Sequence, residues 1–219
     1  MVWAAYVVII AALFDLFDGM AARILNVSSP VGKELDSLAD VVSFGFVPGA
    51  ILFKLLQINL TAISDNEMIT RGIQFLPFTV TLFSAVRLAK FNLDMRQSEY
   101  FIGLPTPANT LLIISLPLIL DDDKFGLRFI ILNPYFLLAL SGVMSFLLVA
   151  ELPLLALKFK NFTWKDNSYQ FILILASVIL LLILKFASLP LIIFLYVLLS
   201  LIKNSVMKNT TTQIGRAHV

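Results

Sequence analysis

Long apolar stretches follow one another along almost the whole chain and constrain its fold more than any other feature. Of the 219 residues, 59% are hydrophobic and only 14% are charged, whereas a soluble globular domain carries about 25% charged residues. A membrane span needs roughly 20 mostly apolar residues. Fewer residues suffice where flanking side chains snorkel. Seven stretches qualify on this basis, of which the fourth and the last are short: 2–25, 38–58, 71–93, 106–120, 129–157, 169–187 and 189–203. The sequence therefore predicts an all-α bundle of about seven transmembrane helices.

The stretches belong to one membrane domain, residues 1–208, because no repeat, soluble domain or long linker separates them. Ser188, Leu189 and Pro190 are all that lies between the last two stretches, which predicts a tight helical hairpin there. The remaining residues, 209–219, are polar and hold the only histidine. We expect this tail to be disordered or non-native.

Lysine and arginine are distributed unevenly over the connections between the stretches. Most of them lie in the first, third and fifth connections and in the C-terminal segment. The positive-inside rule then places the first connection on the cytoplasmic side and the present N-terminus outside. One additional helix before residue 1 would return the N-terminus to the cytoplasm, so we expect that the chain lacks an N-terminal helix.

The first predicted hairpin, residues 13–45, contains four aspartates: Asp15, Asp18, Asp36 and Asp40. A carboxylate at bilayer depth is costly, and such a residue is by default a functional hypothesis. Asp15 and Asp18 are three residues apart and share one face of the first helix. Gly32, Asp36 and Asp40 follow one another at intervals of four and share a face of the second. Folding of the hairpin can therefore bring all four carboxylates together.

Small residues and a helix boundary accompany the aspartates. Gly19 and Ala22 have almost no side chain, which lets a ligand or a second helix approach the backbone closely. Residues 26–29 break the helix, and Ser29 is a favoured N-cap before a proline at the first helical position. Arg23 can neutralise phosphate charge.

Four clustered carboxylates would carry a charge of about −4, which cannot remain unpaired in a low-dielectric site. Two divalent cations would neutralise it, and a set of oxygen ligands favours Mg²⁺ or Mn²⁺. Two such ions about 4 Å apart are known to assist displacement at phosphorus. Alternatively, the carboxylates are interfacial helix caps, or they serve an ion or proton transporter, although transporters tend to show internal repeats.

The spacing D-x2-D-G-x2-A-R-x8-G-x3-D-x3-D, read from Asp15 to Asp40, resembles the signature of the CDP-alcohol phosphatidyltransferases. These integral membrane enzymes transfer a phosphatidyl or similar group from a CDP-linked donor to an alcohol. The resemblance implies that Asp15, Asp18 and Asp36 are metal ligands, and that Asp40 is both a ligand and the general base. It also implies that four further residues line the CDP site: Gly19, Ala22, Arg23 and Gly32.

Other segments are similar to the bacterial and archaeal phosphatidylserine synthases of this family: residues 34–50, 87–92, 101–109 and 143–160. This similarity implies transfer from CDP-diacylglycerol to L-serine, with release of CMP, at the cytoplasmic side of a bacterial or archaeal plasma membrane. Glycerol phosphate and inositol phosphate remain alternative acceptors. Members of the family usually have a further N-terminal helix, in agreement with the expectation drawn from the charges.

Arg87 and Lys90 lie three residues apart at the predicted cytoplasmic end of the third stretch. They can bind the carboxylate of serine or the donor's phosphates, and Asp94 or Asn92 can meet an ammonium group. Positive-inside anchoring explains the two cations equally well. Downstream, Gly103 and two prolines in residues 101–109 predict a break in the chain before the fourth stretch.

The expected partners are the two substrates and the lipid bilayer. The formal net charge of +2 is too small to indicate a nucleic-acid partner. The absence of cysteine excludes thiolate metal sites and disulfides. The sequence leaves the oligomeric state open, a homodimer included.

Overall fold

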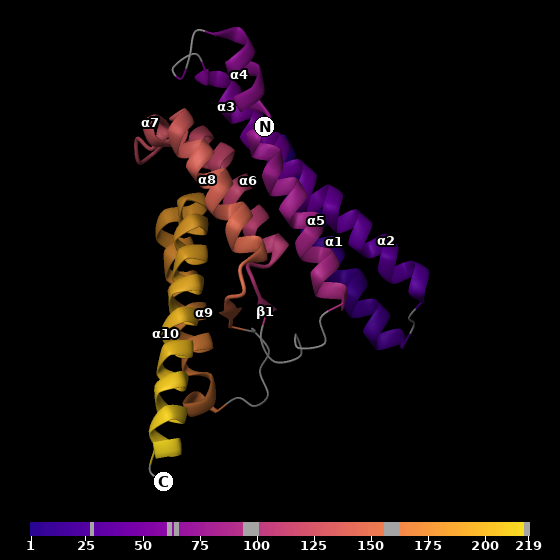
Figure 1. Ribbon diagram of the computed structural model, residues 1–219, viewed down its shortest axis with the longest axis vertical. Helices are drawn as coiled ribbons and strands as arrows, with labels where there is room; N and C mark the ends of the chain where they lie inside the picture. The colour runs from indigo at the N-terminus through magenta and orange to yellow at the C-terminus, as the bar shows by residue number, and fades with distance from the viewer. Residues whose placement is uncertain (27–28, 61–62, 64–65, 94–100, 156–162, 217–219) are drawn as a thin grey trace.

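The computed structural model describes residues 1–26, 29–60, 63, 66–93, 101–155 and 163–216. The described residues are almost entirely helical, which confirms the predicted all-α membrane bundle (Figure 1). The α-helices are α1 (Val2–Leu25), α2 (Pro30–Asp40), α3 (Val47–Ile58), α4 (Glu67–Gln74), α5 (Thr79–Leu93), α6 (Thr106–Asp122), α7 (Arg128–Ile131), α8 (Pro134–Val149), α9 (Trp164–Leu184) and α10 (Ser188–Arg216). The shorter elements are η1 (Val41–Phe46), η3 (Leu76–Phe78), η5 (Lys185–Ala187), β1 (Phe101–Ile102) and β2 (Pro153–Leu154).

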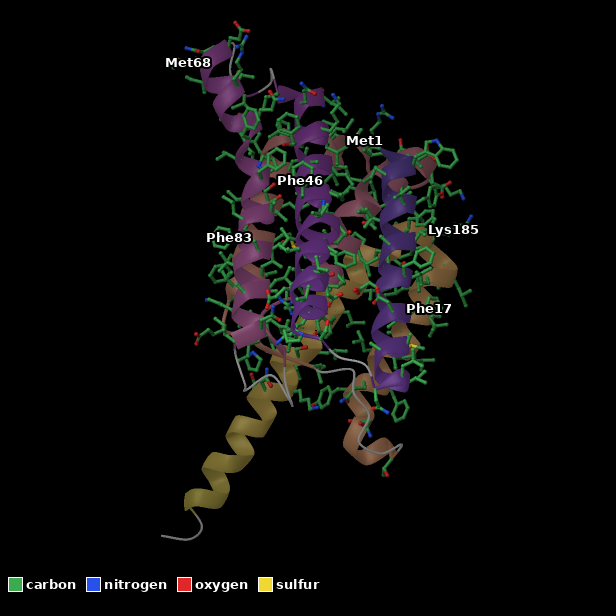
Figure 2. The ribbon with its side chains drawn as sticks, turned by 90° about the vertical axis from the view of Figure 1, so that its right-hand side faces the viewer. Met1, Phe17, Phe46, Met68, Phe83 and Lys185 are labelled. Carbon is green, nitrogen blue, oxygen red and sulfur yellow. The ribbon has the colours of Figure 1, made fainter. Side chains whose placement is uncertain are left out.

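Among the described residues, four helical segments are long and apolar enough to cross a membrane: Val2–Ala22, Pro30–Ile58, Glu67–Leu93 and Asn167–Ser205. The last of these contains both α9 and α10, which fold back on each other at η5 (Figure 1). The fourth and fifth predicted stretches correspond to the shorter helices α6 and α8. In Figure 2, Phe17 and Phe83 point away from the bundle, as expected of side chains that face lipid.

The termini of the helices lie in two groups, one at each end of the bundle. The end of α1, the start of α2, the end of α5 and the β1–β2 sheet lie toward the lower end of Figure 1. Met1, α4 and α7 lie toward the upper end. The described helix ends that flank the lysine- and arginine-rich connections therefore lie toward one end of the molecule.

The helix α2 continues through a π-helix, η1, into α3. In a regular α-helix the carbonyl of Phe44 would accept the N–H of residue 48, but Pro48 has none. Instead, the hydroxyl of Thr110 donates to the Phe44 oxygen at 2.8 Å, and the hydroxyl of Thr81 donates to the Gly45 oxygen at 3.0 Å. Side chains of α5 and α6 thus bind the two carbonyl oxygens of this irregular turn. These bonds fix both helices against the continuous α2–η1–α3 rod, which carries Asp36 and Asp40.

The core lies where α6 passes through the bundle. Ile113, Ile114 and Leu118 of α6 are fully buried, and α6 contacts α1, α3 and α10. Glycine allows a second close contact, because a Cβ atom at Gly49 would lie 2.5 Å from the hydroxyl oxygen of Thr81. The approach of α5 to the α2–η1–α3 rod therefore depends on small residues as well as on apolar burial.

The structure corrects the predicted fifth stretch, 129–157. The segment forms α7, then α8, and the helix ends at Val149. Pro153 and Leu154 form β2, which pairs antiparallel with β1. Proline cannot continue a helix without losing a hydrogen bond, and the short sheet instead supplies partners for the backbone of both segments.

Gly103 allows the predicted break before α6. Its φ is +77°, and a Cβ atom there would lie 2.6 Å from the carbonyl oxygen of Leu148. Its N–H donates to the Leu152 oxygen at 2.9 Å, and the N–H of Leu104 donates to the Leu147 oxygen at 2.8 Å. Glycine is needed because the backbone is left-handed at this point and passes directly against the end of α8.

One C-terminal feature differs from the sequence-based expectation. The turn between the last two stretches is η5, and Ser188 to Pro190 form the first turn of α10 instead. The helix α10 continues to Arg216. Once a helix has formed, each added residue gains a hydrogen bond without a further nucleation cost. The only histidine, His218, lies outside the described residues.

Candidate active site

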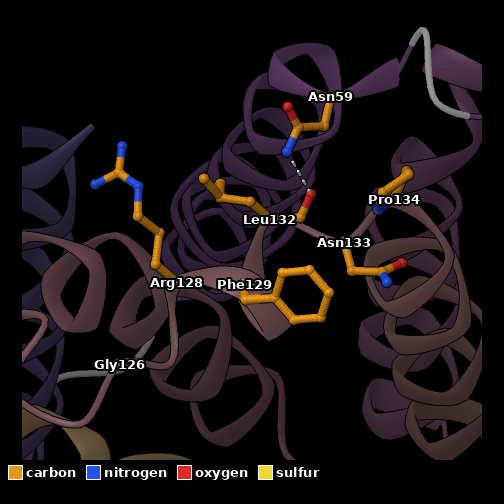
Figure 3. Close-up of a pocket in the computed structure, with 7 residues that line it drawn as sticks. All are labelled: Asn59, Gly126, Arg128, Phe129, Leu132, Asn133 and Pro134. Atoms are coloured by element: carbon orange, nitrogen blue, oxygen red, sulfur yellow. Dashed lines mark hydrogen bonds between the residues drawn. The ribbon is translucent and has the colours of Figure 1, made fainter.

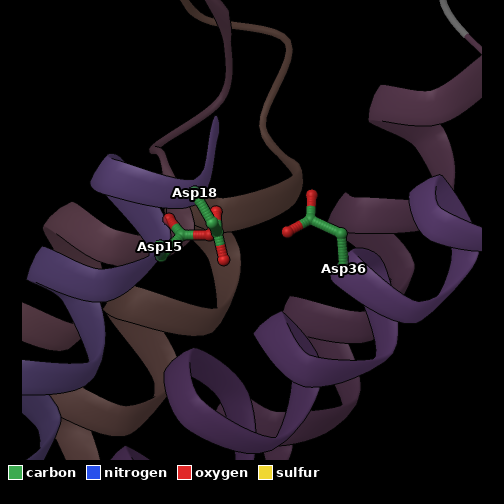
Figure 4. A group of neighbouring side chains, drawn as sticks. All are labelled: Asp15, Asp18 and Asp36. Carbon is green, nitrogen blue, oxygen red and sulfur yellow. The ribbon is translucent and has the colours of Figure 1, made fainter. Parts of the chain in front are cut away.

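Three of the four predicted aspartates form a close group between α1 and α2. Asp15 and Asp18 extend from α1 toward Asp36 of α2 (Figure 4). One carboxylate oxygen of each lies within 4.8 Å of those of the other two. Asp15 is half-buried, whereas Asp18 and Asp36 are exposed. Three anions at this separation repel one another, and the arrangement can hold a divalent cation.

The start of α2 explains how Asp36 comes to face α1. The hydroxyl of Ser29 accepts a hydrogen bond from the N–H of Gly32 at 2.9 Å, and Pro30 begins the helix, as the sequence predicts. A Cβ atom on Gly32 would lie 2.9 Å from the Ser29 oxygen. Glycine therefore preserves the N-cap, and the cap sets where Asp36 and Asp40 fall on the helix.

Asp40 is the last residue of α2, one turn beyond Asp36, and is not part of the close group. It is half-buried and interacts electrostatically with Asp15, Asp36 and Arg87. The fourth predicted carboxylate thus lies deeper in the bundle, between the other aspartates and a buried cation. This position is suited to a group that faces both a metal site and a second substrate.

The residues expected to line the CDP site differ in their surroundings. No atom lies within 4 Å of a Cβ atom placed on Gly19, so this part of α1 borders open space. Ala22, one turn further on, is exposed. Gly32 has the structural role at the N-cap given above. The side chain of Arg23 lies outside what the structure describes.

Arg87 and Lys90 have different environments, although the sequence placed them on one face of α5. Arg87 is only 7% exposed, and its guanidinium carbon lies 5.2 Å from the centre of the Phe91 ring. Its charge interacts with Asp40 and with Tyr196 of α10. Lys90 is exposed. Residues three apart point about 60° from each other around the helix, which is enough for one to face the core and the other to lie at the edge of that face.

Asn92 connects α5 to the aspartate hairpin. Its side-chain amide donates to the hydroxyl of Ser37 at 2.9 Å, and that hydroxyl donates to the Lys33 carbonyl at 3.1 Å. Ser37 directly follows Asp36, so this contact holds the end of α5 beside the close group of carboxylates. The neighbouring Asp94 lies outside the described residues.

Sequence reasoning missed a set of buried polar residues around η1. Ser84, Thr106 and Asn109 are each fully buried and come from α5 and α6. The sequence does contain a sign of this set. Thr106, Asn109 and Thr110 are spaced so that their polar groups lie along one side of an otherwise apolar helix. Without the packing of α6 against η1, that spacing does not indicate what these residues face.

A separate cavity of about 600 Å³ lies at the end of the bundle opposite the aspartates (Figure 3). The side-chain amide of Asn59 donates to the Leu132 carbonyl at its rim, at 3.1 Å. Its lining includes Arg128 and Phe129 but, among the seven described residues that form it, no carboxylate. A metal-dependent reaction is therefore expected at the aspartate end.

This chain belongs to the CDP-alcohol phosphatidyltransferase family, whose sequence model matches residues 1–157. The matched region contains the aspartate group, Asp40 and Arg87. Family membership thus agrees with the arrangement of the site and confirms the resemblance carried by the aspartate spacing.

Several curated relatives carry one name, CDP-diacylglycerol–serine O-phosphatidyltransferase. The protein of that name from Saccharomyces cerevisiae is 36% identical over 139 residues, which are 57% of this chain and 46% of the relative. The Helicobacter pylori 26695 protein is 33% identical over 142 residues, 60% of this chain and 56% of the relative. The Bacillus subtilis protein is 34% identical over 124 residues, 54% of this chain and 65% of the relative. The chain spans about half the length of the curated relatives it matches.

Proposed function

We propose that this protein transfers the phosphatidyl group from CDP-diacylglycerol to L-serine and releases CMP. The observation that carries the proposal is the group of three carboxylates within 4.8 Å of one another, with Asp40 and the buried Arg87 beside it. The names of the relatives support CDP-diacylglycerol as donor and serine as acceptor.

Asp15, Asp18 and Asp36, with Asp40, would hold two divalent cations, Mg²⁺ or Mn²⁺. The donor set fits, because it consists only of carboxylate oxygens, which hard cations prefer. When bound, such ions polarise the phosphoryl group and stabilise the leaving oxygen. Gly19 and Ala22 leave the adjacent surface of α1 free for the CDP part of the donor, and we assign Arg23 and Gly32 to the same subsite.

In the proposed mechanism the chain's own residues move one proton, and no covalent phosphatidyl-enzyme forms. The hydroxyl of serine is a poor nucleophile at neutral pH and needs a positioned base. In the proposed step, its oxygen forms a bond to the diacylglycerol-linked phosphorus and its proton passes to Asp40. The phosphoanhydride bond breaks, and its electron pair leaves with CMP. Direct displacement of this kind inverts the configuration at phosphorus.

The bundle is that of an integral membrane protein, and we propose that the aspartate end faces the cytoplasm. The described helix ends that flank the lysine- and arginine-rich connections lie at this end (Figure 1), which by the positive-inside rule supports a cytoplasmic orientation. Both a soluble acceptor and soluble CMP would then exchange with the cytoplasm, while the diacylglycerol chains stay in the bilayer. A bacterial or archaeal plasma membrane is the proposed location.

The function is tested with the full chain reconstituted in lipid vesicles that contain labelled CDP-diacylglycerol. CMP release and a new labelled lipid are expected with L-serine in the presence of Mg²⁺ or Mn²⁺. Glycerol phosphate and inositol phosphate, supplied separately, are expected to give neither product. Turnover with one of these phosphates, and none with serine, would replace serine as the acceptor while leaving the chemistry in place.

Arg87→Gln is expected to raise the KM for serine by about ten-fold or more, because a hydrogen bond to a charged group is worth roughly 1.5–3 kcal/mol. Lys90 is exposed, and we assign it to the donor's phosphates at the surface. Lys90→Gln should therefore raise the donor KM only a few-fold, with an effect that fades at high salt. Steady-state kinetics at two ionic strengths distinguish the two residues. If both variants have normal kinetics, Arg87 and Lys90 do not bind substrate and serve in membrane anchoring instead.

A further inference from the structure

Four buried side chains around η1 have polar atoms without a hydrogen-bond partner in the described part of the chain. They are the hydroxyls of Ser84 and Thr106, the Nε of Arg87, and both amide atoms of Asn109. Ser84, Thr106 and Asn109 are fully buried, and Arg87 is 7% exposed. Leaving a buried donor or acceptor unpaired costs roughly 1–3 kcal/mol, so such a concentration is unexpected unless a polar ligand or water occupies the space.

The contacts of η1 place these side chains within about one helical turn of the level of Asp40. The hydroxyl of Thr110 lies 2.8 Å from the Phe44 oxygen and 2.9 Å from the Thr106 oxygen. The helices α2 and α6 run in the same direction (Figure 1). One helical turn before this contact therefore leads to Thr106 on α6 and to Asp40 at the end of α2, and Asn109 lies just before Thr110.

The helix α5 brings Arg87 to the same level from the other side. A Cβ atom on Gly45 would lie 3.1 Å from the Cβ of Ser84, so Ser84 packs directly against η1. Because α5 runs in the opposite direction (Figure 1), Arg87 lies one turn closer to Asp40. This agrees with the electrostatic interaction between the two charges. The unpartnered groups thus come from both sides of η1 and lie within about one helical turn of the level of the proposed base.

We propose that Asn109 and Thr106, together with Arg87, form the acceptor subsite and bind the amino-acid part of L-serine. This assignment rests on the proposed function. Arg87 pairs with the carboxylate, and the amide oxygen of Asn109 and the hydroxyl of Thr106 accept hydrogen bonds from the ammonium group. The hydroxyl of serine then points to Asp40. Neither Asn109 nor Thr106 carries a charge, so together they suit a zwitterion better than a phosphate dianion.

The test compares two acceptors that differ only in the ammonium group, L-serine and 3-hydroxypropanoate. In the wild-type protein, kcat/KM for serine should exceed that for 3-hydroxypropanoate by about ten-fold or more, since the groups that bind the ammonium would be left unpaired by the analogue. Asn109→Leu is expected to raise the KM for serine and to reduce this preference at least about ten-fold. The donor KM should stay unchanged.

Thermal unfolding separates this role from a structural one. Leucine removes a buried polar group without a partner and is close to asparagine in size, so Asn109→Leu should unfold at the same or a higher temperature. Added L-serine should raise the unfolding temperature of the wild-type protein but not of the variant. Ser115→Ala is the matched control. Ser115 is fully buried in the same helix, but its hydroxyl already has a partner, because it donates to the carbonyl oxygen of Leu112 at 2.6 Å.

The outcomes are distinguishable. A wild-type protein that is inactive with serine would overturn the proposed function itself. An active wild-type protein whose preference for serine is unchanged by Asn109→Leu would overturn the subsite assignment and leave water as the occupant. Thr106→Val, which keeps the side-chain shape, gives the same comparison if the leucine variant does not fold.

Discussion

Asp40→Asn is expected to abolish CMP release with serine while preserving binding of CDP-diacylglycerol. A general base contributes roughly 10²–10⁴-fold to the rate, and the amide of asparagine cannot accept the proton. Asp40 lies outside the close group of three carboxylates and next to the buried Arg87. Its replacement should therefore leave much of the donor site intact. Steady-state turnover and equilibrium binding of the labelled donor measure the two effects separately.

Asp121→Asn is the matched control for this variant, since Asp121 is exposed and lies on α6 at the opposite end of the bundle. Its turnover should equal that of the wild-type protein. Full activity of Asp40→Asn would remove Asp40 as the base. Retention of configuration at phosphorus, or a trapped phosphatidyl-enzyme, would instead contradict direct displacement.

Removal of divalent cations is expected to reduce turnover to background, and Mg²⁺ or Mn²⁺ should restore it. The physical reason is the close approach of Asp15, Asp18 and Asp36, whose mutual repulsion needs a counter-charge and whose oxygens suit hard cations. Titration with Mn²⁺, followed by electron paramagnetic resonance, should reach two ions per chain. Asp36→Asn should weaken that binding and shift the metal requirement for activity to higher concentrations.

Two further observations check the metal prediction without relying on turnover. Because a bound ion stabilises the folded state, Mn²⁺ should raise the unfolding temperature of the wild-type protein and raise that of Asp36→Asn less. Asp122→Asn, which alters only an exposed pair with Lys124, should behave as the wild-type protein does. Undiminished turnover in excess chelator would contradict a metal requirement.

Much of the site could be predicted because its determinants are local. The three-residue spacing of Asp15 and Asp18 places them on one side of any helix. Ser29 and Pro30 mark where the second helix begins, and the interval of four then aligns Asp36 with Asp40. The apolar stretches indicate helices because the backbone must satisfy its own hydrogen bonds in a bilayer. None of these inferences requires knowledge of distant contacts.

Other features depend on partners that are distant in sequence. The end of α8 at Val149 depends on the pairing of β1 with β2 and on the close passage of Gly103. The π-helix at η1 is stabilised by hydroxyls from Thr81 and Thr110, which lie 36 and 66 residues away from the carbonyls they bind. Local propensity cannot reveal such contacts, because it describes a segment without its neighbours.

The sequence by itself determined that this chain is a membrane helix bundle and that Asp15, Asp18 and Asp36 meet in the first hairpin. Periodicity and helix caps suffice for this because they act within one turn or two. Only the tertiary structure decided which residues surround Asp40. It separated Arg87 from Lys90 and buried Asn109 and Thr106 beside η1. The physical reason is that burial and pairing are properties of packed helices: the same polar side chain is solvated at one rotation of its helix and enclosed at another.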